Sequence, residues 1–456
     1  MRWVALALMI ISLPILIGWL KARRARRDYA LTAIGLLTFL GGDLAIEPSI
    51  ISWPVWAGLA RGIFLTPSDV LALALIATRG GSHSRVPFRL LIAVYAIPVM
   101  LSMAFSPVPF ATFFVVVQVL QMGVLFVAVA GEVARPGALR SLLIGLSLGL
   151  MLQAGYVIQQ KLSGVVQAPG TFVHQNLLGM MVELAVLPVV AAVLEGERSK
   201  IMYGGIIGGM IVIAGGGSRA AMAIVAVAIG VLVLVSIARR MTPRKLQVMG
   251  MGVLALAIAV PLGQATLKDR FGDASVLSQE EQRAALARSA RLIADDYPFG
   301  VGANQFVPVT NTGGYATRAG VAWSAGNRAI PVHNSYLLAR AETGRAGEIM
   351  QILLLMIPAL AGLRLAFGRR KGATPGIVLG VAVALIAVAV HNLFEYAWAV
   401  RTVQVMFFLN LAIIAGSMRA AKLERTASRR AALAQAEQPI AEPAAPALAS
   451  LSRPTG

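Results

Sequence analysis

Residues 220–237 read AAMAIVAVAIGVLVLVSI, a run without any charged side chain. As an α-helix, a run of this length can cross the hydrocarbon core of a bilayer, which needs about 20 apolar residues. Comparable runs recur along almost the whole chain. The sequence therefore predicts an all-α, polytopic membrane protein.

Window length gives about 12 to 13 transmembrane helices. The first is predicted to be a retained span, because its basic cluster follows the apolar run, whereas a signal peptide has that cluster before the run. The segment 47–65 is rich in Pro and Trp and is predicted to lie at the membrane interface. The predicted spans are 4–20, 29–46, 66–78, 88–105, 110–130, 139–158, 176–194, 201–216, 220–237, 247–265, 346–367, 375–394 and 402–418.

The composition agrees with a polytopic membrane protein in contact with membrane lipids. Of 456 residues, 58% are hydrophobic and 13% are charged, whereas a soluble domain averages about 25% charged residues. The net charge of +20 comes largely from short connections, as the positive-inside rule predicts, so nucleic acid is not an expected partner. The connections assigned to the cytoplasm are 21–27, 79–89, 132–140, 195–200, 238–245 and 368–371.

One connection on the opposite, periplasmic side is much longer than the others. We assign 1–418 to a transmembrane domain that includes this periplasmic loop at 266–345, and 419–456 to a disordered cytoplasmic tail. Within the loop, 278–296 is predicted to be a helix with Ser278 as its N-cap. Residues 311–328 are predicted to be irregular. Long loops in compact domains are commonly functional.

Cysteine is absent, which excludes disulfides, thiolate metal sites and cysteine nucleophiles. Two acidic pairs, Asp43/Glu47 and Asp295/Asp296, leave metal-dependent transfer as a minor alternative. Neither pair has the additional ligands that a metal site normally needs. We therefore expect no metal and no other cofactor.

Arginines on the periplasmic side are not explained by the positive-inside rule. Arg219 follows three glycines and Ser218, and both a guanidinium and glycine-rich backbone N–H groups can bind a phosphate. The structural alternative is a tight turn with a snorkelling arginine. Arg283 and Arg288, on the predicted loop helix, are further candidates, although charges on such a helix commonly mark a solvated face.

Three of the four histidines are predicted on the periplasmic side, where a neutral imidazole can accept a proton. His333 precedes Asn334 at the start of a long apolar helix, and capping of that helix is its alternative role. His174 precedes another span together with Asn176, and His391 ends a third span. His83 lies in a cytoplasmic loop and is not expected to take part.

Four motifs in this order resemble the O-antigen ligase family, whose relatives include O-antigen and exopolysaccharide polymerases and pilin oligosaccharyltransferases. The resemblance extends over residues 170–400. The motifs are Gly170-Thr171-Phe172 with His174 and Asn176; Ser218-Arg219; Arg283 with Pro298-Phe299-Gly300-Val301-Gly302; and His333-Asn334 with Glu342-Thr343-Gly344 and Gly347.

The resemblance implies an inverting, metal-independent transfer at the periplasmic face. A glycan would leave undecaprenyl diphosphate for a hydroxyl of lipid A core or of another glycan. His333 matches the proposed general base, Arg219 the arginine that holds the diphosphate, and Arg283 the loop arginine, with Arg288 one turn away. The family's usual tryptophan after the loop arginine is absent, and Leu286 or a neighbour takes its place. Supporting roles are expected for His174, Asn176, Ser218, Asn334, Glu342 and His391.

Two other functions stay open from the sequence. A polymerase that joins lipid-linked repeat units would use the same donor and the same attack by a sugar hydroxyl. A transporter or flippase of lipid-linked sugars would need no catalytic base, but the chain has no internal repeat of the kind common in transporters.

Overall fold

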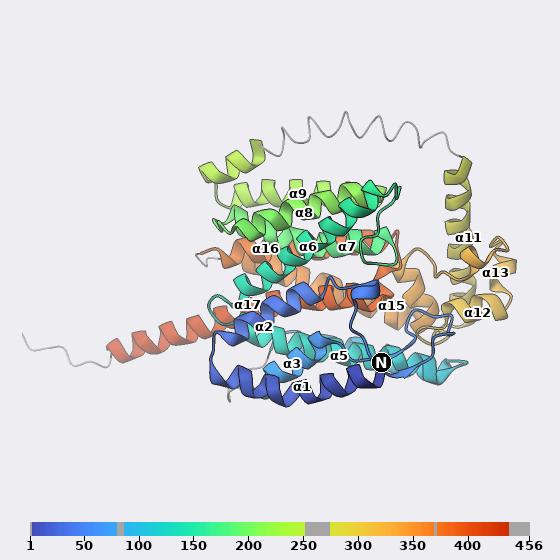
Figure 1. Cartoon of the computed structure of the whole chain (residues 1–456), viewed down its shortest axis with the longest axis horizontal. Helices are drawn as coiled ribbons and strands as arrows, with labels where there is room; N and C mark the ends of the chain where they lie inside the picture. The colour runs from blue at the N-terminus through green and yellow to red at the C-terminus, as the bar shows by residue number, and fades with distance from the viewer. Residues whose placement is uncertain (1, 80–85, 251–273, 369–371, 437–456) are drawn as a thin grey trace, which may run out of the picture.

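The computed structural model describes residues 2–79, 86–250, 274–368 and 372–436, and most of them are helical (Figure 1). Among these residues, eight helices are long and apolar enough to cross a membrane. They are α1 (Arg2–Ala22), α5 (Pro109–Val133), α6 (Ala138–Leu162), α7 (Gln175–Leu194), α9 (Arg219–Arg239), α15 (Ser335–Ala366), α16 (Thr374–His391) and α17 (Arg401–Ala436). The predicted all-α, multi-pass membrane architecture is confirmed.

The remaining predicted spans are shorter helices or lie outside the described part. Three are apolar but short: α3 (Pro67–Ala77), α4 (Arg89–Ser102) and α8 (Lys200–Gly216). The span expected at 29–46 is α2 (Arg26–Leu37), which ends early and is followed by the 3-10 turn η1 (Gly42–Leu44). The span expected at 247–265 falls mainly on 251–265, outside the described residues.

Helix α7 forms the centre of the bundle. The apolar residues of α7 are all buried, and this helix packs against α16 and α17. A helix that is apolar on every face, as α7 is, has to be surrounded by other helices or lipid. In Figure 1, α8 and α9 lie on one side of this centre and α5, α3 and α1 lie on the other.

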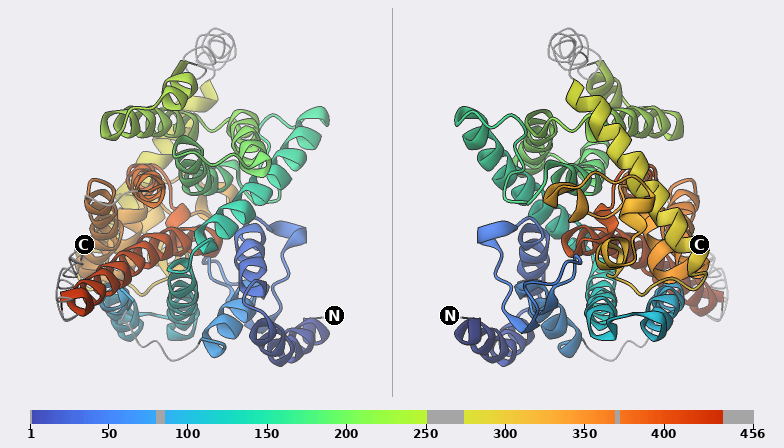
Figure 2. Two further views of the ribbon diagram at one scale, coloured as in Figure 1. Left: turned by 90° about the vertical axis from the view of Figure 1, so that its left-hand side faces the viewer. Right: turned by 90° about the vertical axis from the view of Figure 1, so that its right-hand side faces the viewer.

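A smaller helical unit covers one end of the bundle. It consists of α11 (Ala274–Asp296), α12 (Phe306–Thr312), α13 (Tyr315–Arg318) and α14 (Ala325–Arg328). Figure 1 shows α11 to α13 at the right, and the right view in Figure 2 shows α11 crossing that end. The unit has its own hydrophobic core, in which Leu286 and Ile293 of α11 pack with Phe306 of α12. Leu286, noted where the family has tryptophan, is therefore a core residue.

The secondary structure of this loop differs from the prediction in three places. Helix α11 begins at Ala274, so Ser278 lies inside it, because the residues before Ser278 continue the helix. The segment 311–328, expected to be irregular, contains the end of α12 together with α13 and α14. These helices are four to seven residues long, too short for a periodic pattern to be recognised. The loop also ends earlier, because α15 begins at Ser335 and not at 346.

Helix α15 is kinked at Gly344, whose φ of 70° and ψ of −176° are not helical. The kink frees two carbonyl groups, which accept hydrogen bonds from a loop: Val301 N–H donates to Ala341 O at 3.0 Å and Gly302 N–H donates to Glu342 O at 2.8 Å. The motifs at 298–302 and 342–344 therefore dock onto each other. This contact attaches the α11–α14 unit to the bundle.

A short antiparallel hairpin precedes α3. It pairs β1 (Ser49–Ser52) with β2 (Gly62–Phe64). Asn304 fixes the loop between these strands, since its side chain accepts from Ala60 N–H at 3.0 Å and donates to Ala60 O at 2.7 Å. The segment predicted to be interfacial is thus attached to the end of the bundle that carries α11–α14.

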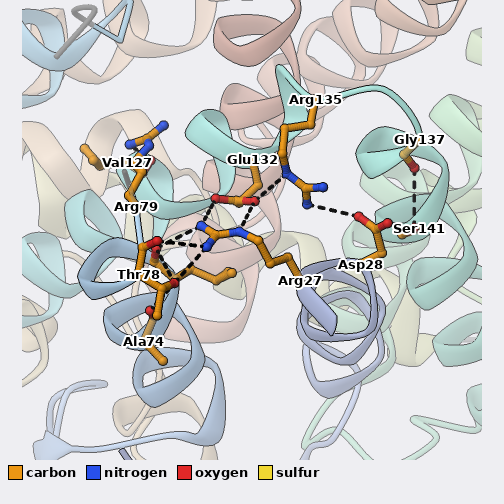
Figure 3. Close-up of polar contacts among 11 residues, drawn as sticks. Arg27, Asp28, Ala74, Thr78, Arg79, Val127, Glu132, Arg135, Gly137 and Ser141 are labelled. Atoms are coloured by element: carbon orange, nitrogen blue, oxygen red, sulfur yellow. Dashed lines mark hydrogen bonds and ion pairs between the residues drawn. The ribbon is translucent and has the colours of Figure 1, made fainter. Parts of the chain in front are cut away.

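The opposite end of the bundle carries a buried ionic network (Figure 3). Arg27 of α2 donates from Nε to Glu132 of α5 at 2.9 Å and from Nη1 to the backbone oxygen of Thr78 at 3.1 Å. Arg135 links the same Glu132, at 2.7 Å, to Asp28, at 3.0 Å. Three helices, α2, α3 and α5, are therefore joined at this end.

Helix α17 extends beyond the bundle to Ala436, so the tail expected to be disordered from residue 419 is helical over 419–436. These residues are rich in Ala, Leu, Arg, Lys and Glu, which have high helix propensity. The composition that suggested a disordered tail is equally suited to a solvated helix.

Candidate active site

A cavity of about 1330 Å³ lies between the bundle and α11. Its wall includes the first residues of α7 and α9, one face of α11, the segment that leads into α15, and the connection between α16 and α17. Seven of the residues selected from the sequence border it: His174, Asn176, Ser218, Arg219, Arg283, Arg288 and His333. Asn334 follows His333 in the chain and caps α15.

His333 and Glu395 form a hydrogen-bonded pair in the wall of this cavity. Its Nδ1 lies 3.2 Å from Oε2 of Glu395, and the two side chains are 15% and 5% exposed. With the proton on Nδ1 donated to the carboxylate, Nε2 is left free to accept a proton. The ring of Tyr396 contacts the imidazole edge to face, with a centroid distance of 5.2 Å. Such an arrangement can hold an imidazole in one tautomer, with Nε2 available as a proton acceptor.

Glu395 is itself held by several groups. Oε1 accepts a hydrogen bond from the side chain of Asn176 and lies 3.5 Å from Nη2 of Arg283. Burial raises the pKa of this carboxyl, but the hydrogen bond with His333 and the charges of His333, Arg283 and His391 outweigh it, and the pKa is lowered. Glu395 is therefore ionised at neutral pH.

The arginines of the cavity differ in how far their charge is neutralised. Arg283 lies near two carboxylates, Glu395 and, at 4.0 Å, Glu280. Arg288 donates twice to the backbone oxygen of Ala319, at 3.2 and 3.0 Å, which leaves its charge uncompensated. Arg219 is exposed in the cavity and has no carboxylate partner among the described residues. Arg219 and Arg288 are thus the arginines available to an anion.

Three helix N-termini add to this positive region. His174 caps α7, since its Nδ1 accepts from Asn176 N–H at 3.2 Å, and Ser218 caps α9 by accepting from Ala221 N–H at 3.4 Å. Asn334 caps α15 through two backbone N–H groups, at 3.0 and 2.9 Å. Helix N-termini carry partial positive charge and commonly bind phosphates. The cavity is suited to a diphosphate.

The cap at His174 requires a neutral ring. Burial lowers the pKa of His174, the charges of His333 and Arg283 act in the same direction, and Glu395 opposes them. His174 is therefore an acceptor at neutral pH, in a structural role. Asn334 also has a structural role, because its amide donates to Leu393 O at 3.1 Å and so connects His333 to the loop that carries Glu395.

Two residues expected to support the site lie elsewhere. Glu342 is buried behind the kink, where it accepts from Phe306 N–H at 3.0 Å and so holds the start of α12. His391 is completely buried between α16 and α7, with Nδ1 2.6 Å from Oε1 of Glu183. Its effect on the cavity is the long-range charge felt by Glu395. His83 lies outside the described residues.

The acidic pairs considered as metal ligands have other neighbours. Asp296 accepts from the hydroxyl of Tyr315 at 2.7 Å and lies 3.5 Å from Arg318. Glu47 lies in a separate small pocket with Arg401. In the part of the chain that the structure describes, no group of three His, Asp or Glu side chains is placed to hold a metal ion.

Glu395 is a site residue that the sequence places near His391 but that was not selected as a candidate. It stands in His391-Asn392-Leu393-Phe394-Glu395. The available signal was an acidic residue in a short connection between apolar helices, predicted to be periplasmic, where a buried charge needs a partner.

Part of the chain matches a known protein family. Residues 204–352 match a family model described as O-antigen ligase. The chain is therefore similar to the O-antigen ligase family over these residues, which are about a third of its length. The matched region contains α8, α9, α11 and the first part of α15, and with them Arg219, Arg283, Arg288 and His333. A search of curated proteins finds no match to the chain.

This match agrees with the resemblance found in the sequence and points to a bacterial membrane enzyme of the glycosyltransferase or ligase type, of the kind used in lipopolysaccharide biosynthesis. The family acts on a lipid-linked glycan and a glycan acceptor. His174, Asn176 and Glu395 lie outside the matched region and meet it only in the folded chain.

Proposed function

We propose that this protein is an O-antigen ligase family enzyme that transfers a glycan from undecaprenyl diphosphate to an acceptor hydroxyl at the periplasmic face of the inner membrane. The observation that carries the proposal is the His333–Glu395 pair in the same cavity as Arg219 and Arg288. The basic connections predicted to be cytoplasmic, such as 132–140 and 195–200, belong to the opposite end of the helices, which supports a periplasmic cavity.

In the proposed reaction, Nε2 of His333 removes the proton from the acceptor hydroxyl. The oxygen then attacks the anomeric carbon from the face opposite the diphosphate, and the bond between that carbon and the phosphate oxygen breaks. The electron pair leaves with undecaprenyl diphosphate, and the configuration is inverted. Base catalysis of this kind typically contributes about 10²- to 10⁴-fold.

Arg219 and Arg288, together with the N-termini of α7 and α9, would stabilise the charge of the leaving diphosphate. Groups fixed in advance around a developing charge are usually the largest contribution to catalysis. Because these residues supply positive charge, the proposed transfer needs no metal ion. Lipid A core or another glycan is the proposed acceptor.

The test is transfer by purified protein in lipid nanodiscs, with wild type compared with H333A and R219A. We expect H333A to lose at least about 10²-fold in turnover and to regain part of it with added imidazole. R219A should mainly weaken use of the diphosphate donor. R318A, an exposed arginine on α13, is the matched control. Full transfer by H333A would overturn the assignment of the base.

Ligase and polymerase functions are separated in cells that lack the protein. Full-length polymer on undecaprenyl with bare lipid A core supports the ligase. Single repeat units on the carrier, without long chains, show a polymerase. A transporter would instead move lipid-linked sugar across vesicles without forming a glycosidic bond.

A further inference from the structure

Trp323 is exposed to an unusual degree. It lies in the loop 319–324 between α13 and α14, and 84% of its surface is accessible. Indole is a large apolar group, and burying it would be favourable. A single exposed apolar residue needs no special explanation, so the case depends on how this ring is held and where it lies.

Arg328 holds the ring from one side. Its guanidinium lies 4.0 Å from the centroid of the Trp323 ring. The same guanidinium donates to Val321 O at 3.2 Å and to Thr317 Oγ1 at 3.3 Å. Asn311 donates to the backbone oxygen of Arg328 at 2.8 Å. The guanidinium thus covers one face of the indole, while the high exposure shows that the other is accessible.

The loop that carries the ring borders the proposed catalytic cavity. Ala322 on one side of it and Asn327 on the other both line that cavity. Gln282 of α11 accepts from Ala322 N–H at 3.2 Å, and its own amide nitrogen has no hydrogen-bond partner in the described structure. Figure 1 shows α13, which precedes this loop, at the end of the molecule beyond the long helices. The loop that carries the ring is therefore next to the cavity and beyond the ends of the long helices.

A sugar is the ligand that suits such a ring. One face of a pyranose presents C–H groups, and its hydroxyls point outward from the edge. An indole can therefore cover the C–H face while the hydroxyls stay in water or bond to neighbouring amides. Because the ring is held by Arg328, little conformational freedom is lost on binding. An anion is less suitable, since Trp323 offers no donor beyond its indole N–H.

We propose that Trp323, braced by Arg328, is a sugar-binding platform that stacks on a pyranose of the glycan next to the sugar that reacts. The proposal rests on the proposed glycan transfer and extends it to substrate recognition. The stacked sugar belongs either to the donor glycan or to the acceptor glycan, which the experiment separates.

The experiment compares wild type, W323A and W323F in nanodiscs, with donors that carry one sugar or several sugars on the same prenyl diphosphate. We expect W323A to raise KM for the longer donor between about threefold and tenfold, the effect of losing one aromatic contact. Its kcat, and its KM for the single-sugar donor, should be unchanged, and W323F should keep most of the binding. If the difference appears only when the acceptor is lengthened, the platform serves the acceptor.

The control is W3A, because Trp3 is also exposed, at 63%, and also lies against an arginine, with Arg2 4.7 Å from its ring centroid. Trp3 belongs to α1 and not to the cavity. Equal KM values for W323A and wild type on every donor and acceptor would overturn the proposal. So would a loss that is the same for short and long glycans.

A second readout keeps the two proposals distinguishable. Saturation-transfer NMR with the free oligosaccharide measures contact with the protein without any reaction. A signal in wild type that is lost in W323A supports the platform even if transfer is absent and the proposed function fails. Transfer by wild type, with no loss of oligosaccharide contact in W323A, leaves the function intact and rejects the platform.

Discussion

Glu395 determines which form of His333 can act as a base. Its carboxylate contacts His333, Asn176 and Arg283, which come from three different parts of the chain. Ser335 also donates from its hydroxyl to the backbone oxygen of Glu395 at 2.6 Å. Because both the carboxylate and the backbone are fixed, we infer that Glu395 positions the imidazole without touching the substrate.

E395Q tests this positioning role. The amide keeps the size of the side chain but cannot pair with an imidazolium. We expect kcat to fall about 10- to 100-fold, as is usual when an orienting partner of a functional histidine is lost. We expect KM to change little, since Glu395 does not touch the substrate. The measurement is kcat and KM, with E197Q, a carboxylate paired with Arg140, as control.

The same variant has a signature in stability. The pKa of Glu395 is lowered in the folded protein, so its ionised form stabilises the fold above the unfolded value of about 4.3. That contribution is lost as the pH falls through the folded pKa. Wild type should therefore lose more thermal stability than E395Q between neutral and acid pH. An unchanged kcat in E395Q, together with the same pH dependence of thermal stability in both proteins, would contradict the assignment.

At the scale of single residues, the sequence was sufficient to select charged or titratable residues at positions where the positive-inside rule does not predict them. Arg219, Arg283, Arg288 and His333 could be selected because basic or titratable groups on the periplasmic side need a reason. Glu342 and His391 met the same criterion, yet their partners are Phe306 and Glu183. Which partner a buried charge finds depends on contacts between residues far apart in the chain, and the sequence does not specify these.

At the scale of elements, the kink of α15 connects the two parts of the fold. Gly300 and Gly344 both have positive φ, of 83° and 70°. A Cβ on Gly300 would lie 2.4 Å from the backbone oxygen of Glu342, and one on Gly344 would lie 2.7 Å from that of Pro298. The glycines of both motifs therefore allow two backbones to approach closely, which explains their spacing without a catalytic role.

The G300A variant tests whether the close approach of the two backbones contributes to stability in addition to the strain of a positive φ. Gly314 is the matched control, because its φ is 73° and a Cβ there meets no atom within 4 Å. We expect G314A to cost about 1 kcal/mol of the free energy of unfolding, for backbone strain alone. G300A should cost at least about 2 kcal/mol more, since backbone atoms have to move. Thermal unfolding in detergent measures both, and equal losses would show that the contact does not hold the unit.

Apolar run length was enough to locate the long helices of the bundle, because the bilayer requires about 20 apolar residues. It could not locate α12, α13 and α14, whose positions are fixed by tertiary contacts such as the Glu342 bond to Phe306 N–H. The kink in α15 could not be predicted from run length either. Its residues 335–343 form a helix before the apolar run begins, and the carbonyl groups at the kink bond to residues 40 positions away in the chain.

For the whole molecule, the ionic network in Figure 3 lies at the end of the bundle opposite the cavity. The side chains of Arg27 and Glu132 are 11% and 3% exposed. Removing one partner of a buried pair typically costs about 3–5 kcal/mol, because the other charge stays buried. Replacing both with apolar residues costs much less. The network therefore stabilises the packing of α2, α3 and α5 and takes no part in the proposed reaction.

E132Q should therefore lower stability without lowering catalysis. We expect a loss of about 3 kcal/mol or more in the free energy of unfolding, with kcat and KM per folded molecule unchanged. The double variant R27M/E132L should recover a large part of that loss, since no charge is left without a partner. Thermal unfolding and transfer assays on the same nanodisc samples measure both quantities. A fall in kcat for folded E132Q would show that the two ends of the bundle are coupled, and an R27M/E132L protein as unstable as E132Q would show that the ion pair is not what joins these helices.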